Sequence, residues 1–303
     1  MIHVDVLCVG ASSFDMTLQV STHPAADEKT TANSLLTCGG GPAANAAVTV
    51  TRLGGTAAYV GYLGTDVYGD RHLAELKTDG VVTDFIVRSS ESTPLSVVLA
   101  KPNGERTLVN YRGAPPLPAD SIDLTPLRAK VMLADGHEPE LSLTAMKHAR
   151  AHGSKTVLDA GSVKPGTLAL ADQVDYLVCS ELFAQEFTGE SDMGTALLKL
   201  TECNPNVVIT LGAKGLIWKT PHGEGSLQAY RVNAIDTTGA GDAFHGAFAL
   251  GVAQGMAWRD LLNFSSAVAA LSTTQVGARI GLPYLKEVDR FLGSSQIHKI
   301  HVA

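Results

Sequence analysis

Short apolar runs alternate with longer amphipathic stretches along most of this 303-residue chain. The first run, residues 4–11 (VDVLCVGA), is almost entirely apolar and is typical of a strand buried on both faces of a parallel sheet. Similar runs lie at residues 130–135, 156–161, 175–180 and 206–212, with amphipathic helices predicted between them at 141–153 and 192–203. This alternation predicts an α/β fold with a mostly parallel central sheet flanked by helices.

A second pattern interrupts this rhythm in the first third of the chain. Residues 93–111 (TPLSVVLAKPNGERTLVNY) hold two β-rich runs around Asn103–Gly104, a dipeptide that favours the type I′ turn of a β-hairpin. Two more extended segments are predicted within residues 13–37. We expect the segments 13–37 and 94–112 to form a small β-sheet lid on a single domain that spans residues 1–303.

The later part of the chain is predicted to be mainly helical. An antiparallel strand pair is expected near residues 215–232, where LIWKT and LQAYRV are rich in β-forming residues. Residues 241–292 follow with helical periodicity. A further helix is predicted to begin at Pro42, where a first turn tolerates proline, and to stop at Gly54–Gly55.

Composition and charge narrow the class of protein. The formal net charge of -7 argues against a nucleic-acid partner, which a basic patch would attract. The N-terminus has no basic leader, and no apolar run approaches the roughly 20 residues that span a bilayer. The scattered Cys8, Cys38, Cys179 and Cys203 form no CxxC pair, so free thiols are expected. These features predict a cytoplasmic protein with no membrane contact.

The stretch DTTGAGDAFHGAF, residues 236–248, carries the strongest chemical signal. A strand at 230–236 is predicted to lead into it, and a helix is predicted to follow. Gly239 and Gly241 lie at the helix entrance, where unpaired N–H groups and the positive dipole end bind anions. Asp242 either interacts favourably with that dipole or accepts a proton from a hydroxyl beside a bound anion.

Two common nucleotide motifs are absent. The chain has no GxxxxGK[ST] segment, which excludes a P-loop NTPase. The turn after the first strand reads GASSFD and lacks the later glycines of a dinucleotide fingerprint, which weakens the interpretation as an oxidoreductase.

A second glycine cluster, CGGGPAANAAV, precedes the helix predicted from Pro42. Gly40 and Gly41 would let a polar ligand approach the backbone, and Asn45 would offer both a donor and an acceptor. The alternative is a turn with tight helix packing. Asp15 is an acid at a strand edge and, taken alone, reads as a solvated turn residue.

The pair of segments GGGPAAN and DTTGAGDAF resembles the two signatures of the ribokinase-like (PfkB) family of sugar kinases. The segments RLGG, YVGYLGTDVYGD, NGERTLVNY, EFTG, VVITLGAKG and GARIGLP also follow the order and spacing of that family, so the resemblance covers essentially the whole chain. It implies a Rossmann-like α/β core with a β-sheet lid, often completed by dimerisation through the lid. It also implies ATP and Mg²⁺ as cofactors and a small sugar as substrate.

The resemblance implies roles for particular residues. Asp242 is similar to the catalytic base that deprotonates the sugar hydroxyl. Gly239, Ala240 and Gly241 are similar to the anion hole for the γ-phosphate. The residues implied to contact the sugar hydroxyls are Asp15, Gly40, Gly41 and Asn45.

Further implied residues concern the nucleotide and a cation. Thr210, Gly212 and Gly215 resemble the adenine-nucleotide loop. Asp236 and Thr238 resemble positions that hold a monovalent cation such as K⁺ near the anion hole.

The sequence also departs from the family pattern. Many members carry an N-x-x-E segment that acts on phosphate and Mg²⁺ through water, and Ser180 and Phe183 stand at those two positions here. The loop GGGPAA and the tail GARIGLP are most similar to a branch that includes sulfofructose kinase and ketohexose kinases. In that branch, Lys29 and Asn110 correspond to residues facing the far end of the sugar. His137 stands where a basic residue is expected, and it reads alternatively as an exposed loop residue.

These observations predict an ATP-dependent kinase that phosphorylates a hydroxymethyl oxygen of a small sugar, with a ketohexose or modified ketose favoured. A nucleoside or 2-keto-3-deoxygluconate kinase of the same fold is the alternative within the class. A non-catalytic sugar or nucleotide sensor is the alternative from another class.

Overall fold

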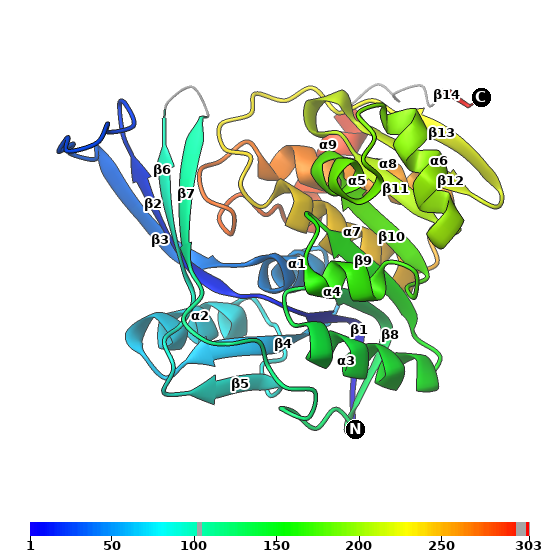
Figure 1. The fold of residues 1–303 in the computed structure, drawn as a ribbon, viewed down its shortest axis with the longest axis horizontal. Helices are drawn as coiled ribbons and strands as arrows, with labels where there is room; N and C mark the ends of the chain where they lie inside the picture. The colour runs from blue at the N-terminus through cyan, green and yellow to red at the C-terminus, as the bar shows by residue number, and fades with distance from the viewer. Residues whose placement is uncertain (102–104, 295–300, 303) are drawn as a thin grey trace.

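The computed structural model describes residues 1–101, 105–294 and 301–302. Its centre is a ten-stranded sheet in the order β14-β13-β12-β11-β10-β9-β8-β1-β4-β5 (Figure 1). These strands are β1 (Ile2–Val9), β4 (Ala57–Gly64), β5 (Ile86–Ser89), β8 (Leu127–Ala134), β9 (Lys155–Ala160), β10 (Tyr176–Ser180), β11 (Val207–Thr210), β12 (Leu216–Thr220), β13 (Gly223–Leu227) and β14 (His301–Val302). The strands from β5 through β11 are parallel to their neighbours, and β12 to β14 are antiparallel. The predicted α/β class is confirmed.

Helices cover both faces of this sheet, which is why its central strands are apolar on both sides. The described helices are α1 (Pro42–Arg52), α2 (Val67–Thr78), α3 (Pro139–Ala151), α4 (Pro165–Leu170), α5 (Glu181–Thr188), α6 (Met193–Cys203), α7 (Ala240–Ala253), α8 (Trp258–Ser272) and α9 (Leu285–Ser294), with a 3₁₀ turn at Gly212–Lys214. Val6 and Cys8 of β1 pack in the cluster that contains α1, α7 and α8. Leu7 and Val9 pack in the cluster that contains α3, α5 and α6. Alternate side chains of one strand therefore enter two separate cores.

A second, four-stranded sheet stands off this body as the predicted lid. Its order is β3-β2-β6-β7, and its strands are β2 (Ser13–Gln19), β3 (Ser34–Gly40), β6 (Leu95–Ala100) and β7 (Arg106–Tyr111). The lid projects from the left of the body in Figure 1. Strands β6 and β7 are antiparallel, with Ala100 opposite Arg106, as the hairpin prediction requires. The Asn103–Gly104 turn itself lies outside the described residues.

Two strand predictions are wrong in position. The partner of β12 is β13, Gly223–Leu227, so LQAYRV begins where that strand ends. Residues 230–236 form no strand; instead the amides of Ile235 and Asp236 donate to the carbonyl of Thr273, at 2.7 and 3.1 Å. In both cases β-forming side chains are present, but side-chain type does not decide which backbone is available to pair with.

Among the residues that the structure describes, no helix combines the length and apolar character needed to cross a bilayer. The described cysteines are free, and Cys8, Cys38 and Cys179 are buried, as expected.

Candidate active site

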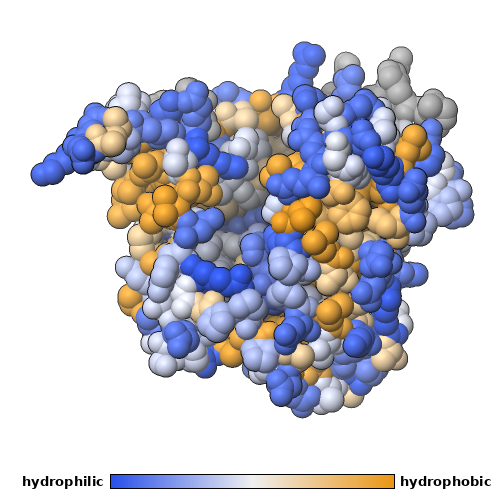
Figure 2. Space-filling model, in the orientation of Figure 1, coloured by the Kyte–Doolittle hydropathy of each residue, from blue (hydrophilic) through white to orange (hydrophobic). Residues whose placement is uncertain are grey.

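A cavity of about 420 Å³ lies between the lid and the carboxyl ends of the central strands. Figure 2 shows the molecule hollowed between the lid and the main body. The predicted residues that line this cavity are Asp15, Gly41, Asn45, Asn110, His137, Thr238 and Asp242. They come from both lid and core, so the fold gathers most of the expected sugar contacts at one place.

The first turn of α7 forms one end of the cavity. Its N-cap, Gly239, has φ of +78°, and a Cβ there would lie 2.8 Å from the Cβ of Ala278. Both the left-handed backbone and the close approach therefore require glycine. A Cβ at Gly241 would meet nothing within 4 Å. In this first turn the amide of Ala240 donates to the carbonyl of Thr237 at 3.3 Å, which leaves the amides of Gly241 and Asp242 as candidate donors to an anion.

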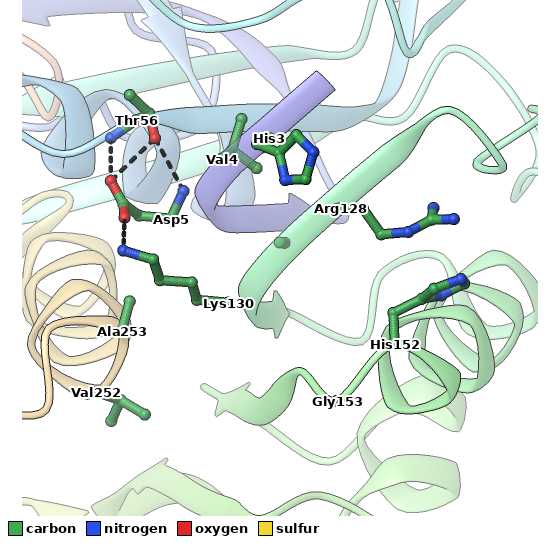
Figure 3. A pocket seen from close by; sticks show the side chains of 11 residues that line it. His3, Val4, Asp5, Thr56, Arg128, Lys130, His152, Gly153, Val252 and Ala253 are labelled. Atoms are coloured by element: carbon green, nitrogen blue, oxygen red, sulfur yellow. Dashed lines mark hydrogen bonds and ion pairs between the residues drawn. The ribbon is translucent and has the colours of Figure 1, made fainter. Parts of the chain in front are cut away.

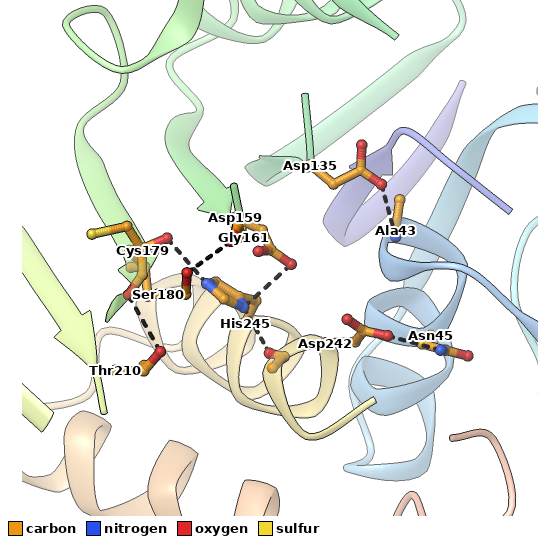
Figure 4. Close-up of polar contacts among 12 residues, drawn as sticks. Ala43, Asn45, Asp135, Asp159, Gly161, Cys179, Ser180, Thr210, Asp242 and His245 are labelled. Atoms are coloured by element: carbon orange, nitrogen blue, oxygen red, sulfur yellow. Dashed lines mark hydrogen bonds and ion pairs between the residues drawn. The ribbon is translucent and has the colours of Figure 1, made fainter. Parts of the chain in front are cut away.

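The Asp242 carboxylate is held at that helix start. Its Oδ2 accepts a hydrogen bond from Asn45 Nδ2 at 2.8 Å (Figure 4). Burial, and then the nearby Asp159 carboxylate, raise the pKa of Asp242 to about 6. The group is therefore ionised at neutral pH but basic enough to take a proton, which suits a general base.

Asp15 of β2 forms the facing wall. It is only 6% exposed, so the alternative of a solvated turn residue is wrong. Ser13 Oγ donates to its Oδ1 at 2.6 Å, and burial raises the pKa of Asp15 to about 6. A Cβ on Gly40 would lie 2.1 Å from Asp15 Oδ2, which explains the glycine without a direct ligand contact.

The far end of the cavity carries groups that the sequence did not single out. Arg112 Nη2 donates to the carbonyl of His137 at 3.0 Å and lies 3.5 Å from Glu138 Oε1. Burial raises the pKa of Glu138 to about 7 and lowers the pKa of His137. Lys164 Nζ lies 3.0 Å from His137 Nε2, which must then accept. His137 is thus a neutral lining residue and not an exposed loop residue.

A contact between His245 of α7 and Asp159 of β9 was also not identified from the sequence. His245 Nδ1 lies 3.2 Å from Asp159 Oδ2 and 2.6 Å from the carbonyl of Gly241, while its Nε2 lies 3.1 Å from the carbonyl of Val178. Both ring nitrogens of His245 therefore face oxygen atoms that can accept a hydrogen bond. The signal in the sequence was a histidine three residues after Asp242, which places both on one side of the helix.

The expected nucleotide residues lie outside the sugar cavity. Ser180 and Thr210 are register partners at the carboxyl ends of β10 and β11. The Ser180 hydroxyl accepts from the amide of Phe183 at 3.0 Å and so caps α5. Gly212 and Gly215 follow β11 with positive φ of 57° and 95°. Carboxyl ends of parallel strands are where ligands bind in this class of sheet.

The residues expected to hold a monovalent cation are already engaged. Asp236 Oδ1 accepts from the amide and hydroxyl of Thr238 at 2.9 and 2.6 Å, and Oδ2 accepts from the amide of Gly277 at 2.9 Å. The guanidinium of Arg106, on the lid, lies 3.6 Å from Asp236 Oδ1. An added cation would meet like charge there, so this arrangement does not fit one.

The described residues also offer no dedicated Mg²⁺ site. No group of three or more His, Cys, Asp or Glu side chains among them could hold a metal. Phe183, at the position of the usual glutamate, is fully buried. Glu181 pairs with Lys214, and Glu186 accepts from the amide of Val163 at 2.8 Å. Mg²⁺ would instead arrive on nucleotide phosphates, its common mode in kinases.

Lys29 is not brought to the cavity. It lies exposed in the segment between β2 and β3 and is not among the lining residues. The expected contact with the far end of the sugar is therefore not present within this chain.

A second hollow, of about 750 Å³, lies at the opposite edge of the sheet (Figure 3). It is lined by the amino-terminal ends of β1 and β8. Its charged groups largely satisfy one another: Lys130 Nζ lies 2.8 Å from Asp5 Oδ1, and Asp5 Oδ2 accepts from Thr56. Open α/β sheets bind ligands at the other edge, where Asp242 lies.

Comparisons with known proteins agree with this geometry. The profile of the pfkB family carbohydrate kinases matches residues 4–285. Ribokinase from Bacillus subtilis (strain 168) is 30% identical over 301 residues, covering 95% of this chain and 99% of the relative. Fructokinase from Solanum tuberosum is 33% identical over 265 residues, covering 80% of this chain and 83% of the relative. The structure of an E. coli protein described as ribokinase II, in complex with ATP and Mg²⁺, has a TM-score of 0.83 to this one. Its sequence is 22% identical, and the match covers 96% of this chain and 100% of that chain.

The family match spans most of the chain, and the same chain carries a glycine-capped helix start with the partly buried carboxylate of Asp242 in its first turn. The protein belongs to the pfkB family of carbohydrate kinases, phosphotransferases that use an alcohol group as acceptor.

Proposed function

We propose that this kinase transfers the γ-phosphate of ATP to a hydroxymethyl oxygen of a neutral ketohexose or a closely related ketose. The observation that carries the proposal is the position of Asp242. Its carboxylate, with a pKa raised to about 6, lines the same cavity as Asp15, Asn45 and Asn110, at the anion-binding start of α7.

The chemistry follows from this arrangement. The acceptor hydroxyl gives its proton to Asp242, and its oxygen attacks the γ-phosphorus in line with the departing ADP oxygen. The amides of Gly241 and Asp242, at the start of α7, stabilise the charge on the phosphoryl oxygens. Mg²⁺ bound to the ATP phosphates supplies further charge neutralisation. Residues of the lid, such as Asn110, hold the sugar from the other side.

The charge of the lining favours a neutral sugar. Asp15, Asp242 and Glu138 contribute carboxyl groups, whereas Arg112 is the cation among the lining residues and already lies 3.5 Å from Glu138. An anionic terminus would meet this acidic wall, which disfavours 2-keto-3-deoxygluconate and sulfonated ketoses. The sequences GGGPAA and GARIGLP resemble those of ketohexose kinases, which supports a ketose substrate. The similarity to the fructokinase of Solanum tuberosum is consistent with a ketose.

The first prediction concerns pH and the base. Because the raised pKa of Asp242 is about 6, the base is ionised above that pH, and kcat/KM should fall about tenfold per unit below it. Burial raises the pKa of Asp15 to about 6 as well, so the acid limb of the pH–rate profile reports the two carboxyl groups together.

Replacing Asp242 by Asn should keep the fold and sugar binding but lower kcat by roughly 10²–10⁴-fold. Coupled ADP release and sugar titration calorimetry measure both. A folded Asp242→Asn protein that retains a tenth of wild-type turnover would exclude this base.

The second prediction concerns the acceptor. Fructose, tagatose, ribose, 2-keto-3-deoxygluconate and a sulfonated ketose are compared by kcat/KM, and a neutral ketohexose should give the highest value. Lys29→Met should change kcat/KM for that sugar by less than about twofold, because Lys29 is exposed and does not line the cavity. A sulfonated or carboxylated acceptor that exceeds the neutral ketoses, with a tenfold loss on Lys29→Met, would overturn the neutral-sugar proposal.

We also propose that a second copy of the chain covers the lid. All six residues of the edge strand β7 are exposed, including Leu108, Val109 and Tyr111, and Leu35 of β3 is 62% exposed. Apolar surface gathers over the lid strands in Figure 2. A long exposed apolar edge strand invites pairing.

The third prediction tests this dimer. Val109→Lys places a charge on the lid edge and should shift the sedimentation coefficient from a dimer to a monomer at micromolar protein. Leu198→Lys, on exposed α6 far from the lid, is the matched control and should leave the dimer intact. A wild-type protein that sediments as a monomer would contradict the proposal.

A further inference from the structure

A buried arginine lies behind the residues that hold Asp242. Arg279, in the segment between α8 and α9, is 3% exposed. Its Nε donates to Asn45 Oδ1 at 3.1 Å, and its Nη2 lies 3.1 Å from His72 Nε2. Its Nη1 has no hydrogen-bond partner among the described residues.

Structural stability alone gives a poor account of this cation. Burying a guanidinium costs several kcal/mol unless it gains an ion pair and a full set of hydrogen bonds. The ion pairs of the described residues do not include Arg279. Its neighbour Arg52, by contrast, pairs with Asp79 and also donates to the carbonyls of Arg279 and Leu282. Arg52 is therefore sufficient to anchor this segment.

The geometry gives Arg279 a definite effect on Asn45. A guanidinium has only donors, so Asn45 must present its amide oxygen to Arg279. Its amide nitrogen then faces the opposite way, where it donates to Asp242 Oδ2 at 2.8 Å. The same logic makes His72 neutral, since its Nε2 must accept from Arg279. The amide of Asn45 is therefore held in one orientation, with its oxygen toward Arg279 and its nitrogen toward Asp242.

We propose that Arg279 is a positioning residue for the phosphoryl transfer: through Asn45 it orients the carboxylate of Asp242 toward the acceptor hydroxyl. The proposal rests on the proposed role of Asp242 as base. The chain of contacts runs from Arg279 to Asn45 to Asp242, and each contact joins segments far apart in sequence.

The pH dependence of the base depends on several charges. The groups that interact with Asp242 are Asp159 at the end of β9, Asp135 after β8, His245 on α7, Asp15 on β2 and His137. The acids raise the pKa of Asp242 and His245 lowers it, as does the hydrogen bond from Asn45. Loss of the orientation of Asn45 removes a stabilising donor from the ionised form. The acid limb of the rate profile should then move to higher pH.

The test compares Arg279→Met with Arg52→Met in the full-length protein. Arg279→Met should lower kcat by about 10- to 100-fold, since small misplacements of a reacting group have effects of this size. It should also raise the apparent pKa of the acid limb, in part because the charge of Arg279 lowers the pKa of Asp15 directly, so the double-variant cycle on kcat carries the positioning role. Arg279→Lys keeps the charge and one donor and should recover part of both. Arg52→Met should lower the melting temperature but leave the acid limb in place.

A double-variant cycle separates positioning from general structural damage. In an Asn45→Ala background, Arg279→Met should change kcat by less than about threefold, because the residue through which it acts is gone. An equal loss in both backgrounds, with an unmoved acid limb, would overturn the inference. If Arg279→Met does not fold, Arg279→Gln enters the same cycle with the same criteria.

Failure of this inference and failure of the base assignment give different results. A folded Asp242→Asn protein with substantial turnover would reject the base, whatever Arg279 does. An inactive Asp242→Asn protein, together with additive effects of Arg279→Met and Asn45→Ala, would reject only the positioning role.

Discussion

The proposed active site depends on keeping one partly buried carboxylate, that of Asp242, ionised beside the start of α7. Burial raises the pKa of Asp242, and the nearby charges of Asp159 and Asp135 raise it further. Two features offset that repulsion. His245 of α7 lies 3.2 Å from Asp159 and lowers the pKa of Asp242, and Asn45 donates directly to Asp242. The balance of these interactions sets the pKa of Asp242 at about 6, a value that suits the proposed general base.

The same edge of the sheet is tied together by Asp135, which follows β8. Its carboxylate accepts from the amides of Ala11, Ala43 and His137, at 2.8, 3.2 and 2.8 Å. These amides belong to the turn after β1, the start of α1 and the far end of the cavity. A Cβ on Gly10 would lie 2.0 Å from Asp135 Oδ1, so the close approach requires glycine. One buried acid thereby fixes three walls of the sugar cavity, and its hydrogen bonds compensate for its burial.

Much of the fold followed from local signals. The apolar runs gave the parallel strands because a strand covered on both faces must be apolar on both. The helix start at Gly239 was predictable because a left-handed residue before a helix favours glycine. The strand expected at 230–236 was wrong because β-forming side chains do not decide which backbone is available to pair with. There the end of α8, at Thr273, supplied the acceptor.

The sequence by itself determined the α/β class, the lid, the anion-binding turn and the acid beside it, because each is encoded within a few adjacent residues. Only the tertiary structure decided the burial of Asp15 and the hydrogen-bond partner of Asp242. Asn45 and Asp242 are 197 positions apart, and Arg279 and Asn45 are 234 positions apart. The burial of Asp15, the orientation of Asn45 and the absence of Lys29 from the cavity depend on which distant segments meet. Contacts between distant segments are set by the packing of the whole chain, and the spacing of residues within one segment does not specify them.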